Sequence, residues 1–184
     1  PPPVATEYFT PGGERGDTLL TVAALVPYKR VEVAIAVARK LGRTLEIIGT
    51  GPRMRALRRL GGPDVRFLGW MSREELRAAY RRAAALLVPN VEDFGMVSVE
   101  ALACGTPVVG LAQSGTADII RGGVEGELAE ESSVDALVEA TSRVLDRRWD
   151  EQLLCQRADL FSRDRFRTRF RFLLDRLGYR EALQ

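Results

Sequence analysis

Short apolar runs alternate with helix-type patterns along most of the chain. Residues 31–38 place apolar side chains every three to four positions, as one face of a helix requires, whereas the flanking apolar runs are short. We expect strands at 19–25, 44–48, 65–68, 84–88, 107–111 and 126–129. We expect helices at 30–41, 52–60, 72–83, 95–104, 116–121, 133–145, 149–160 and 163–177. Apolar strands alternating with helices are typical of a parallel sheet covered on both faces.

Cap and turn residues support this division. Ser72 followed by Glu75 forms a capping box that opens a helix, and Pro52 stands in the first turn of another. Because crossovers between parallel strands are right-handed, we expect an α/β fold, a three-layer, Rossmann-like, doubly wound parallel sheet with further helices at its C-terminal end. Residues 1–18, rich in proline and glycine, predict an interdomain linker or N-terminal extension, and residues 19–184 a single domain.

Composition excludes several kinds of chemistry. The 184 residues include no histidine, which rules out Ser-His-Asp and Cys-His catalysis and histidine-bound zinc. Cys104 and Cys155 lack CxxC spacing, so neither a zinc site nor a disulfide framework is expected, and a reduced, cytoplasmic setting fits. A net charge of +2 gives no indication of nucleic-acid binding. No signal peptide or membrane span is expected.

Unusual residues gather in the loops that follow the expected strands. In a parallel sheet these loops all lie at the same edge, where ligands bind. The segment from Glu92 to Glu100 has a glycine, Gly95, that opens a helix, so the free amides of Gly95, Met96 and Val97 would form an anion site. The two glutamates can accept hydrogen bonds from hydroxyls; alternatively, they are ordinary acids at the start and on the solvated face of a helix.

Two further segments belong to the same expected edge. Lys29 follows the first strand, where a lysine can meet phosphate as a point charge, although a solvated lysine is the alternative. Gly49 to Met54 begins like a GxGxxG dinucleotide motif, but Met54 replaces the third glycine, and a tight turn into a helix explains the pattern equally.

In order along the chain, these segments resemble the C-terminal, donor-binding half of the retaining glycosyltransferases of family 4, which have the GT-B fold. The resemblance is carried by residues 22–30, 45–52, 65–76 and 92–109. It implies a domain that binds a nucleoside diphosphate sugar and belongs to an enzyme transferring a hexose with retention, without a metal or other cofactor. Residues 26–30 and 92–100 are most similar to mannosyltransferases, which favours GDP-mannose, with a UDP-sugar as the alternative donor.

The resemblance also implies roles for single residues. Lys29 would contact the diphosphate and Glu92 the sugar hydroxyls, and these two are the expected catalytic residues. Glu100 would bind the ribose hydroxyls. The donor would further contact Gly51, Met71, Phe94, Gly95, Met96 and Val97, with the base near Trp70, Met71 and Arg73. Leaving-group stabilisation and positioning would supply most of the catalysis.

The sequence departs from the family pattern in two places. Ala24 stands where the family usually has an arginine, so one diphosphate partner is absent unless Arg30 or Arg53 replaces it. Residues 114–118 read Ser-Gly-Thr-Ala-Asp instead of Gly-Gly-x-x-Glu. The N-terminal acceptor domain of the family is also absent from the sequence, so we expect no activity from this domain alone.

Two alternatives to a transferase remain at this point, a non-catalytic interaction module that keeps the fold and a sugar-nucleotide epimerase-like domain. The last helix, 163–177, carries Phe166, Phe170 and Leu173 on one side among arginines. In the family such helices cross back towards the N-terminal domain, so an exposed apolar patch is expected. A helix packed on its own domain, or peripheral contact with the inner face of a membrane, is the alternative.

Overall fold

Residues 1–177 are described by the structure, a computed structural model. Six parallel strands form one sheet: β1 (Leu19–Val22), β2 (Leu45–Ile48), β3 (Val65–Gly69), β4 (Ala85–Leu87), β5 (Val108–Leu111) and β6 (Gly126–Ala129). The main helices are α1 (Val31–Lys40), α2 (Met54–Gly61), α3 (Arg73–Arg82), α4 (Met96–Ala103), α5 (Thr116–Ile119), α6 (Val134–Leu145), α7 (Glu151–Asp159) and α8 (Arg163–Arg176). The predicted α/β fold is confirmed, with element ends shifted by a few residues.

The strand order β3-β2-β1-β4-β5-β6 places the earliest strand in the middle of the sheet. From β1 the chain moves outward to β3, returns to β4 beside β1, and moves outward again to β6. The loops after β1 and β4 therefore diverge, which opens a crevice at the carboxyl edge of the sheet. This topological switch is where the candidate site lies.

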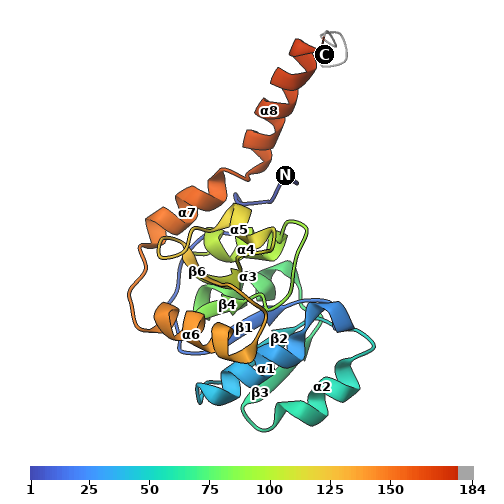
Figure 1. The fold of residues 1–184 in the computed structure, drawn as a ribbon. Helices are drawn as coiled ribbons and strands as arrows, with labels where there is room; N and C mark the ends of the chain where they lie inside the picture. The colour runs from blue at the N-terminus through green and yellow to red at the C-terminus, as the bar shows by residue number, and fades with distance from the viewer. Residues whose placement is uncertain (178–184) are drawn as a thin grey trace.

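Helices cover both faces of the sheet, as Figure 1 shows. Alternating side chains of each strand divide the core into two clusters. One cluster packs β1 and β2 residues such as Leu19 and Ile47 against α1, α2 and α6. The other packs Leu20 and Leu86 against α3, α4 and α7. Helices α3 and α4 thus share one cluster, which fixes their relative position.

The opening segment, expected as a linker or extension, packs against the body of the domain. Val4 and Phe9 are buried in the same cluster as α3 and α4. The amide of Val4 donates to the carbonyl of Phe161 over 2.9 Å, and the Arg15 guanidinium donates to the carbonyls of Ala83 and Gly105. Although its composition is rich in proline and glycine, the opening segment is therefore held on the domain by a few residues. The expected domain end, 178–184, lies outside the described residues.

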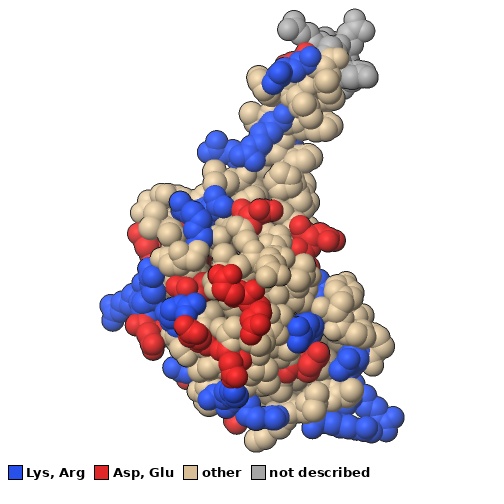
Figure 2. Space-filling view, viewed as in Figure 1, with Lys and Arg blue, Asp and Glu red and all other residues tan. Residues whose placement is uncertain are grey.

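Helix α8 extends away from the body, with the N-terminus beside its base (Figure 1). None of its residues is buried. Phe170 is 47% exposed, and the ring of Phe166 stacks on it at 5.8 Å between centroids. Figure 2 shows basic side chains in blue along this helix, among residues drawn in tan, which are neither basic nor acidic. The exposed, partly apolar surface expected here is therefore present on α8.

Candidate functional site

A hollow of about 530 Å³ opens at the carboxyl edge of the sheet. The loops that follow the first four strands contribute to it: Lys29 comes from the loop after β1, Thr50 from that after β2, Met71 from that after β3, and Glu92 from that after β4. We call this site the edge hollow. Its position at the switch between β1 and β4 is the place where ligands bind in open α/β sheets.

Lys29 is held by a one-turn 3-10 helix, Pro27–Lys29, that follows β1. Proline fixes the first backbone angle, and the amide of Lys29 donates to the carbonyl of Val26 over 3.2 Å. The next residue, Arg30, has φ of 49°, a left-handed conformation that costs a non-glycine residue roughly 1–2 kcal/mol. Such strain is typical of functional loops, and here it turns the chain sharply from Lys29 into α1.

The ammonium of Lys29 is paired with Glu92. Its Nζ lies 2.6 Å from Oε1 and 2.7 Å from Oε2, so the lysine bridges both carboxylate oxygens. The two side chains are only 15% and 17% exposed. Because the ring of Tyr28 also faces Nζ, at 5.1 Å from its centroid, the cation is held at one place in the wall of the edge hollow.

The start of α4 faces the same hollow. Gly95 precedes the helix with φ of 97°, a conformation that favours glycine, and no side chain caps the first turn. Gly95, Met96 and Val97 all line the edge hollow together with Lys29. The uncapped amides of a helix start and a lysine therefore share one cavity, an arrangement suited to an anion such as a diphosphate.

The loop before α4 is fixed by the segment after β5. The amide of Glu92 donates to Ser114 Oγ over 2.8 Å, and the amide of Gly115 donates to the carbonyl of Glu92 over 2.8 Å. A Cβ on Gly115 would lie 2.4 Å from the carbonyl oxygen of Asp93, so only glycine permits this approach. Ser114, which stands in place of the first glycine of the family pattern, and Gly115 thus position Glu92.

Glu100 lies on α4, one turn beyond Met96 and Val97, but it is not among the residues that line the edge hollow. Tyr80 Oη donates to its Oε2 over 2.9 Å. Burial raises the pKa of the Glu100 carboxyl, while the hydrogen bond from Tyr80 and the charge of Arg73 oppose that rise. Tyr80, completely buried, is a site residue that the sequence did not reveal, since it reads as an ordinary core aromatic.

Other predicted donor contacts lie outside the lining of the edge hollow. Gly51 packs against the backbone after β1, where a Cβ would approach Leu25 O to 2.6 Å. The loops after β1 and β2 are joined there by the Leu25 amide, which donates to the carbonyl of Thr50. This favours the tight-turn interpretation of the GxG segment. The ring of Phe94 packs edge-on against Phe161 in the apolar core.

The two arginines offered as substitutes for the missing cation do not line the edge hollow. Arg53 lies 3.9 Å from Glu32, and Arg30 is exposed on the turn into α1. Ala24, at the position of the expected arginine, does line it. Among the described residues that line the hollow, Lys29 is therefore the one basic side chain.

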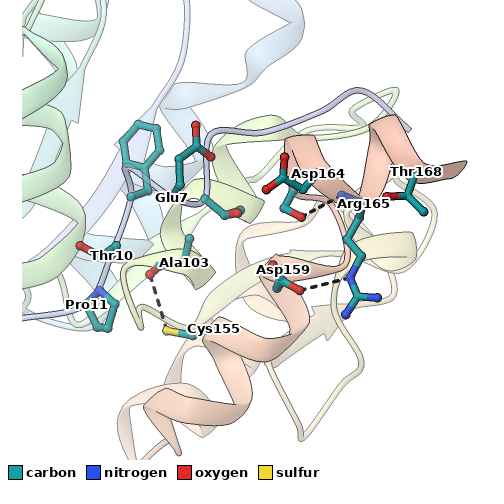
Figure 3. A pocket seen from close by; sticks show the side chains of 12 residues that line it. Glu7, Thr10, Pro11, Ala103, Cys155, Asp159, Asp164, Arg165 and Thr168 are labelled. Atoms are coloured by element: carbon teal, nitrogen blue, oxygen red, sulfur yellow. Dashed lines mark hydrogen bonds and ion pairs between the residues drawn. The ribbon is translucent and has the colours of Figure 1, made fainter. Parts of the chain in front are cut away.

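A second hollow, of about 560 Å³, lies between the opening segment, α7 and the start of α8 (Figure 3). Its charged side chains pair with their neighbours: Arg165 lies 3.3 Å from Asp159, and Glu7 lies 3.2 Å from Arg163. Cys155 turns its thiol to the carbonyl of Ala103, at 3.5 Å, and burial raises the pKa of that thiol. Ser162 Oγ caps the start of α8 by accepting from the Arg165 amide, whereas no side chain caps the start of α4, so this hollow offers less to an anion than the edge hollow.

Within residues 1–177, no helix is long and apolar enough to cross a membrane. The same residues contain no group of three or more acidic or cysteine side chains arranged to hold a metal ion.

Comparison with known proteins decides the family. Residues 10–159 match the family model of glycosyl transferases group 1. The chain belongs to this family. It is 33% identical over 169 residues to a D-inositol 3-phosphate glycosyltransferase of Mycolicibacterium smegmatis, covering 79% of this chain and 39% of that protein. It is 35% identical over 175 residues to the enzyme of that name from Kribbella flavida, covering 78% and 41%. The chain thus spans about two-fifths of the length of these curated relatives.

Solved structures agree on the fold of this family member. Sucrose-phosphate synthase from Thermosynechococcus elongatus superposes with a TM-score of 0.81 at 23% identity, covering 97% of this chain and 52% of that one. Anabaena HepE, solved in complex with UDP and glucose, gives a TM-score of 0.78 at 17% identity, covering 94% and 55%. The GT-B, Rossmann-like architecture expected from the sequence is therefore shown.

Proposed function

We propose that this domain binds the nucleoside diphosphate sugar donor of a retaining hexosyltransferase. The observation that carries the proposal is the convergence of Lys29 and the uncapped start of α4 on the edge hollow. Lys29 would hold the diphosphate from one side and the amides of Met96 and Val97 from the other. Both interactions gain strength as negative charge develops on the departing diphosphate, which is how electrostatic catalysis works.

The reaction we propose is the one that the family resemblance implies. The bond from the anomeric carbon to the phosphate oxygen breaks, and its electron pair leaves with the nucleoside diphosphate. The acceptor hydroxyl oxygen bonds to the same carbon from the same face, and its proton passes to the departing phosphate oxygen. Glu92, beside Lys29, would accept hydrogen bonds from the sugar hydroxyls, and Glu100 from the ribose hydroxyls. The base would lie near Trp70 and Met71, which line the edge hollow.

The acceptor half of the enzyme would be a further domain, because the curated relatives are more than twice the length that this chain matches. We expect donor binding without transfer from this domain alone. GDP-mannose, favoured by the resemblance in sequence, and a UDP-sugar, as in the HepE complex, are the two candidate donors.

Calorimetric titration of the chain with GDP, UDP and ADP tests the proposal. We expect one of GDP and UDP to bind with a dissociation constant below the millimolar range. Lys29→Ala should weaken that binding about tenfold or more, because a hydrogen bond to a charged group contributes about 1.5–3 kcal/mol. Lys40→Ala is the matched control: it removes the other lysine of the chain, which pairs with Asp135 on the exposed surface.

A non-catalytic interaction module is the second candidate, and Ala24 favours it. The edge hollow lacks the arginine of the family pattern there, and neither Arg30 nor Arg53 replaces it in the lining. If none of the three nucleotides binds below the millimolar range, the donor site is refuted and the module is favoured. If Lys29→Ala binds as tightly as the parent chain, Lys29 is not a phosphate ligand.

A further inference from the structure

Tyr80 and Glu100 form a buried contact between α3 and α4. Tyr80 Oη donates to Glu100 Oε2 over 2.9 Å, and the tyrosine is 0% exposed. Burial raises the pKa of Tyr80 well above its usual range, so its hydroxyl stays protonated and remains a donor. The carboxylate of Glu100 therefore has one oxygen fixed by a neutral group.

The second oxygen of Glu100 stays available. Across residues 1–177, the carboxylate of Glu100 accepts no hydrogen bond besides that of Tyr80 and forms no salt bridge. A largely buried carboxylate without a salt-bridge partner is costly, so such an arrangement is uncommon unless a ligand uses the charge. Since a phenol satisfies Oε2 without neutralising the charge, Oε1 keeps its full capacity to accept hydrogen bonds.

The position of Tyr80 is itself fixed from several sides. Thr106 Oγ1 donates to the carbonyl oxygen of Tyr80 over 2.5 Å, and Arg15 donates to Thr106 Oγ1 over 3.2 Å. Phe9 of the opening segment packs edge-on against the Tyr80 ring, with 5.8 Å between centroids. These contacts, from the opening segment and from the segment after α4, hold the Tyr80 side chain and its hydroxyl in one position.

We propose that Tyr80 is a positioning residue that turns the Glu100 carboxylate towards the ribose hydroxyls of the bound nucleotide, so that the Tyr80–Glu100 pair sets a preference for ribonucleotides. The inference rests on the proposed function, in which Glu100 binds the ribose. Tyr80 touches no ligand itself; it acts through Glu100 alone. Its loss would therefore affect the part of the affinity that depends on the ribose hydroxyls and leave the diphosphate contacts unchanged.

The test compares a ribonucleoside diphosphate with its 2′,3′-dideoxy counterpart, using whichever of GDP and UDP the parent chain binds. Removing both hydroxyls should weaken binding to the parent chain about tenfold or more, as for loss of a hydrogen bond to a charged group. Tyr80→Phe keeps the buried ring and removes only the hydroxyl. In this variant we expect the ratio of the dissociation constants of the dideoxy ligand and the ribonucleotide to fall to about threefold or less. A merely structural role would weaken both ligands equally and leave the ratio unchanged.

Tyr8→Phe is the matched control. It removes a tyrosine hydroxyl that donates to Glu74 over 2.8 Å. Glu74 lies on the exposed side of α3, the helix that also carries Tyr80, so the ratio of dissociation constants should stay at the parent value. Thermal unfolding of each variant shows whether it is folded. If Tyr80→Phe does not fold, Glu100→Gln, which leaves the ring packing of Tyr80 in place, carries the test, and it too should reduce the ratio.

The outcomes separate the two proposals. If the parent chain binds neither GDP nor UDP, the proposed function fails and this inference fails with it. If the parent chain binds but shows no preference for the ribonucleotide, or if folded Tyr80→Phe retains the parent ratio, only the positioning role is overturned. Retention of the ratio in Glu100→Gln overturns it as well.

Discussion

At the scale of single residues, the paired charges of Lys29 and Glu92 raise a question of competition. Both oxygens of Glu92 accept hydrogen bonds from the lysine, at 2.6 and 2.7 Å. A diphosphate must share that cation or displace the carboxylate. Glu92 therefore lowers the affinity for a free nucleotide while, in the proposed mechanism, it contributes to binding of the sugar.

We expect Glu92→Gln to bind the free nucleoside diphosphate several times more tightly than the parent chain, because one negative charge beside the anion is removed. The advantage of the nucleoside diphosphate sugar over the free nucleotide should fall at the same time. Calorimetry with both ligands measures the two effects. Glu127→Gln, which breaks the ion pair between Glu127 on β6 and Arg143 on α6, is the control and should change neither. Weaker binding of the free nucleotide by Glu92→Gln would contradict the competition.

Lys29, Glu92 and Gly95 are predictable as members of one site because each follows a strand, and parallel strands bring such loops to one edge. The ion pair between Lys29 and Glu92 is not predictable, since a lysine and a glutamate 63 positions apart carry no signal of contact in the sequence. Tyr80 is not predictable as a site residue for another reason. It lies on the core face of an amphipathic helix, where the pattern indicates burial and says nothing of its hydroxyl.

At the scale of elements, the loop before α4 depends on the loop after β5. Gly115 touches the backbone of Asp93 and Phe94, and Gly115→Ala would place a methyl group 2.4 Å from the Asp93 carbonyl oxygen. Backbone cannot yield as a flexible side chain does, so the loop carrying Glu92 and Gly95 must shift. Overpacking of this kind costs about 1–3 kcal/mol.

We therefore expect Gly115→Ala to lower the thermal unfolding midpoint by about 2–10 °C and to weaken nucleotide binding as well. Calorimetry and thermal unfolding of the same sample measure both. Gly122→Ala serves as the control, because a Cβ there meets nothing within 4 Å, and it should leave both quantities near the parent values. A Gly115→Ala protein with unchanged midpoint and affinity would show that the two loops are independent.

The elements themselves were predictable to within a few residues, because apolar runs and caps such as Ser72 mark them directly. The capping box there is present, with Ser72 Oγ accepting from the Glu75 amide. The opening segment was less predictable. Its prolines and glycines are typical of a linker, and its attachment depends on single apolar residues, Val4 and Phe9, which form no periodic pattern.

At the scale of the whole molecule, α8 carries an exposed apolar face. Phe166, Phe170 and Leu173 lie on one side of it, and together with Pro1 and Pro2 they line a shallow apolar groove. Arginines such as Arg169 flank that side. The sequence predicts the amphipathic pattern of α8, but the periodicity of apolar residues does not show what covers an apolar face.

If the apolar face of α8 has no partner within this domain, replacing it should cost little stability. We expect the double variant Phe170→Ser with Leu173→Ser, residues that are 47% and 51% exposed, to change the free energy of unfolding by less than about 1 kcal/mol. Phe9→Ser, at 3% exposure, is the contrast and should lose about 3 kcal/mol or more, because it removes a packed ring from the core. Urea unfolding followed by circular dichroism measures both. A large loss in the α8 variant would mean that the helix packs on its own domain in solution, and the expectation of an outside partner for this face would have to be abandoned.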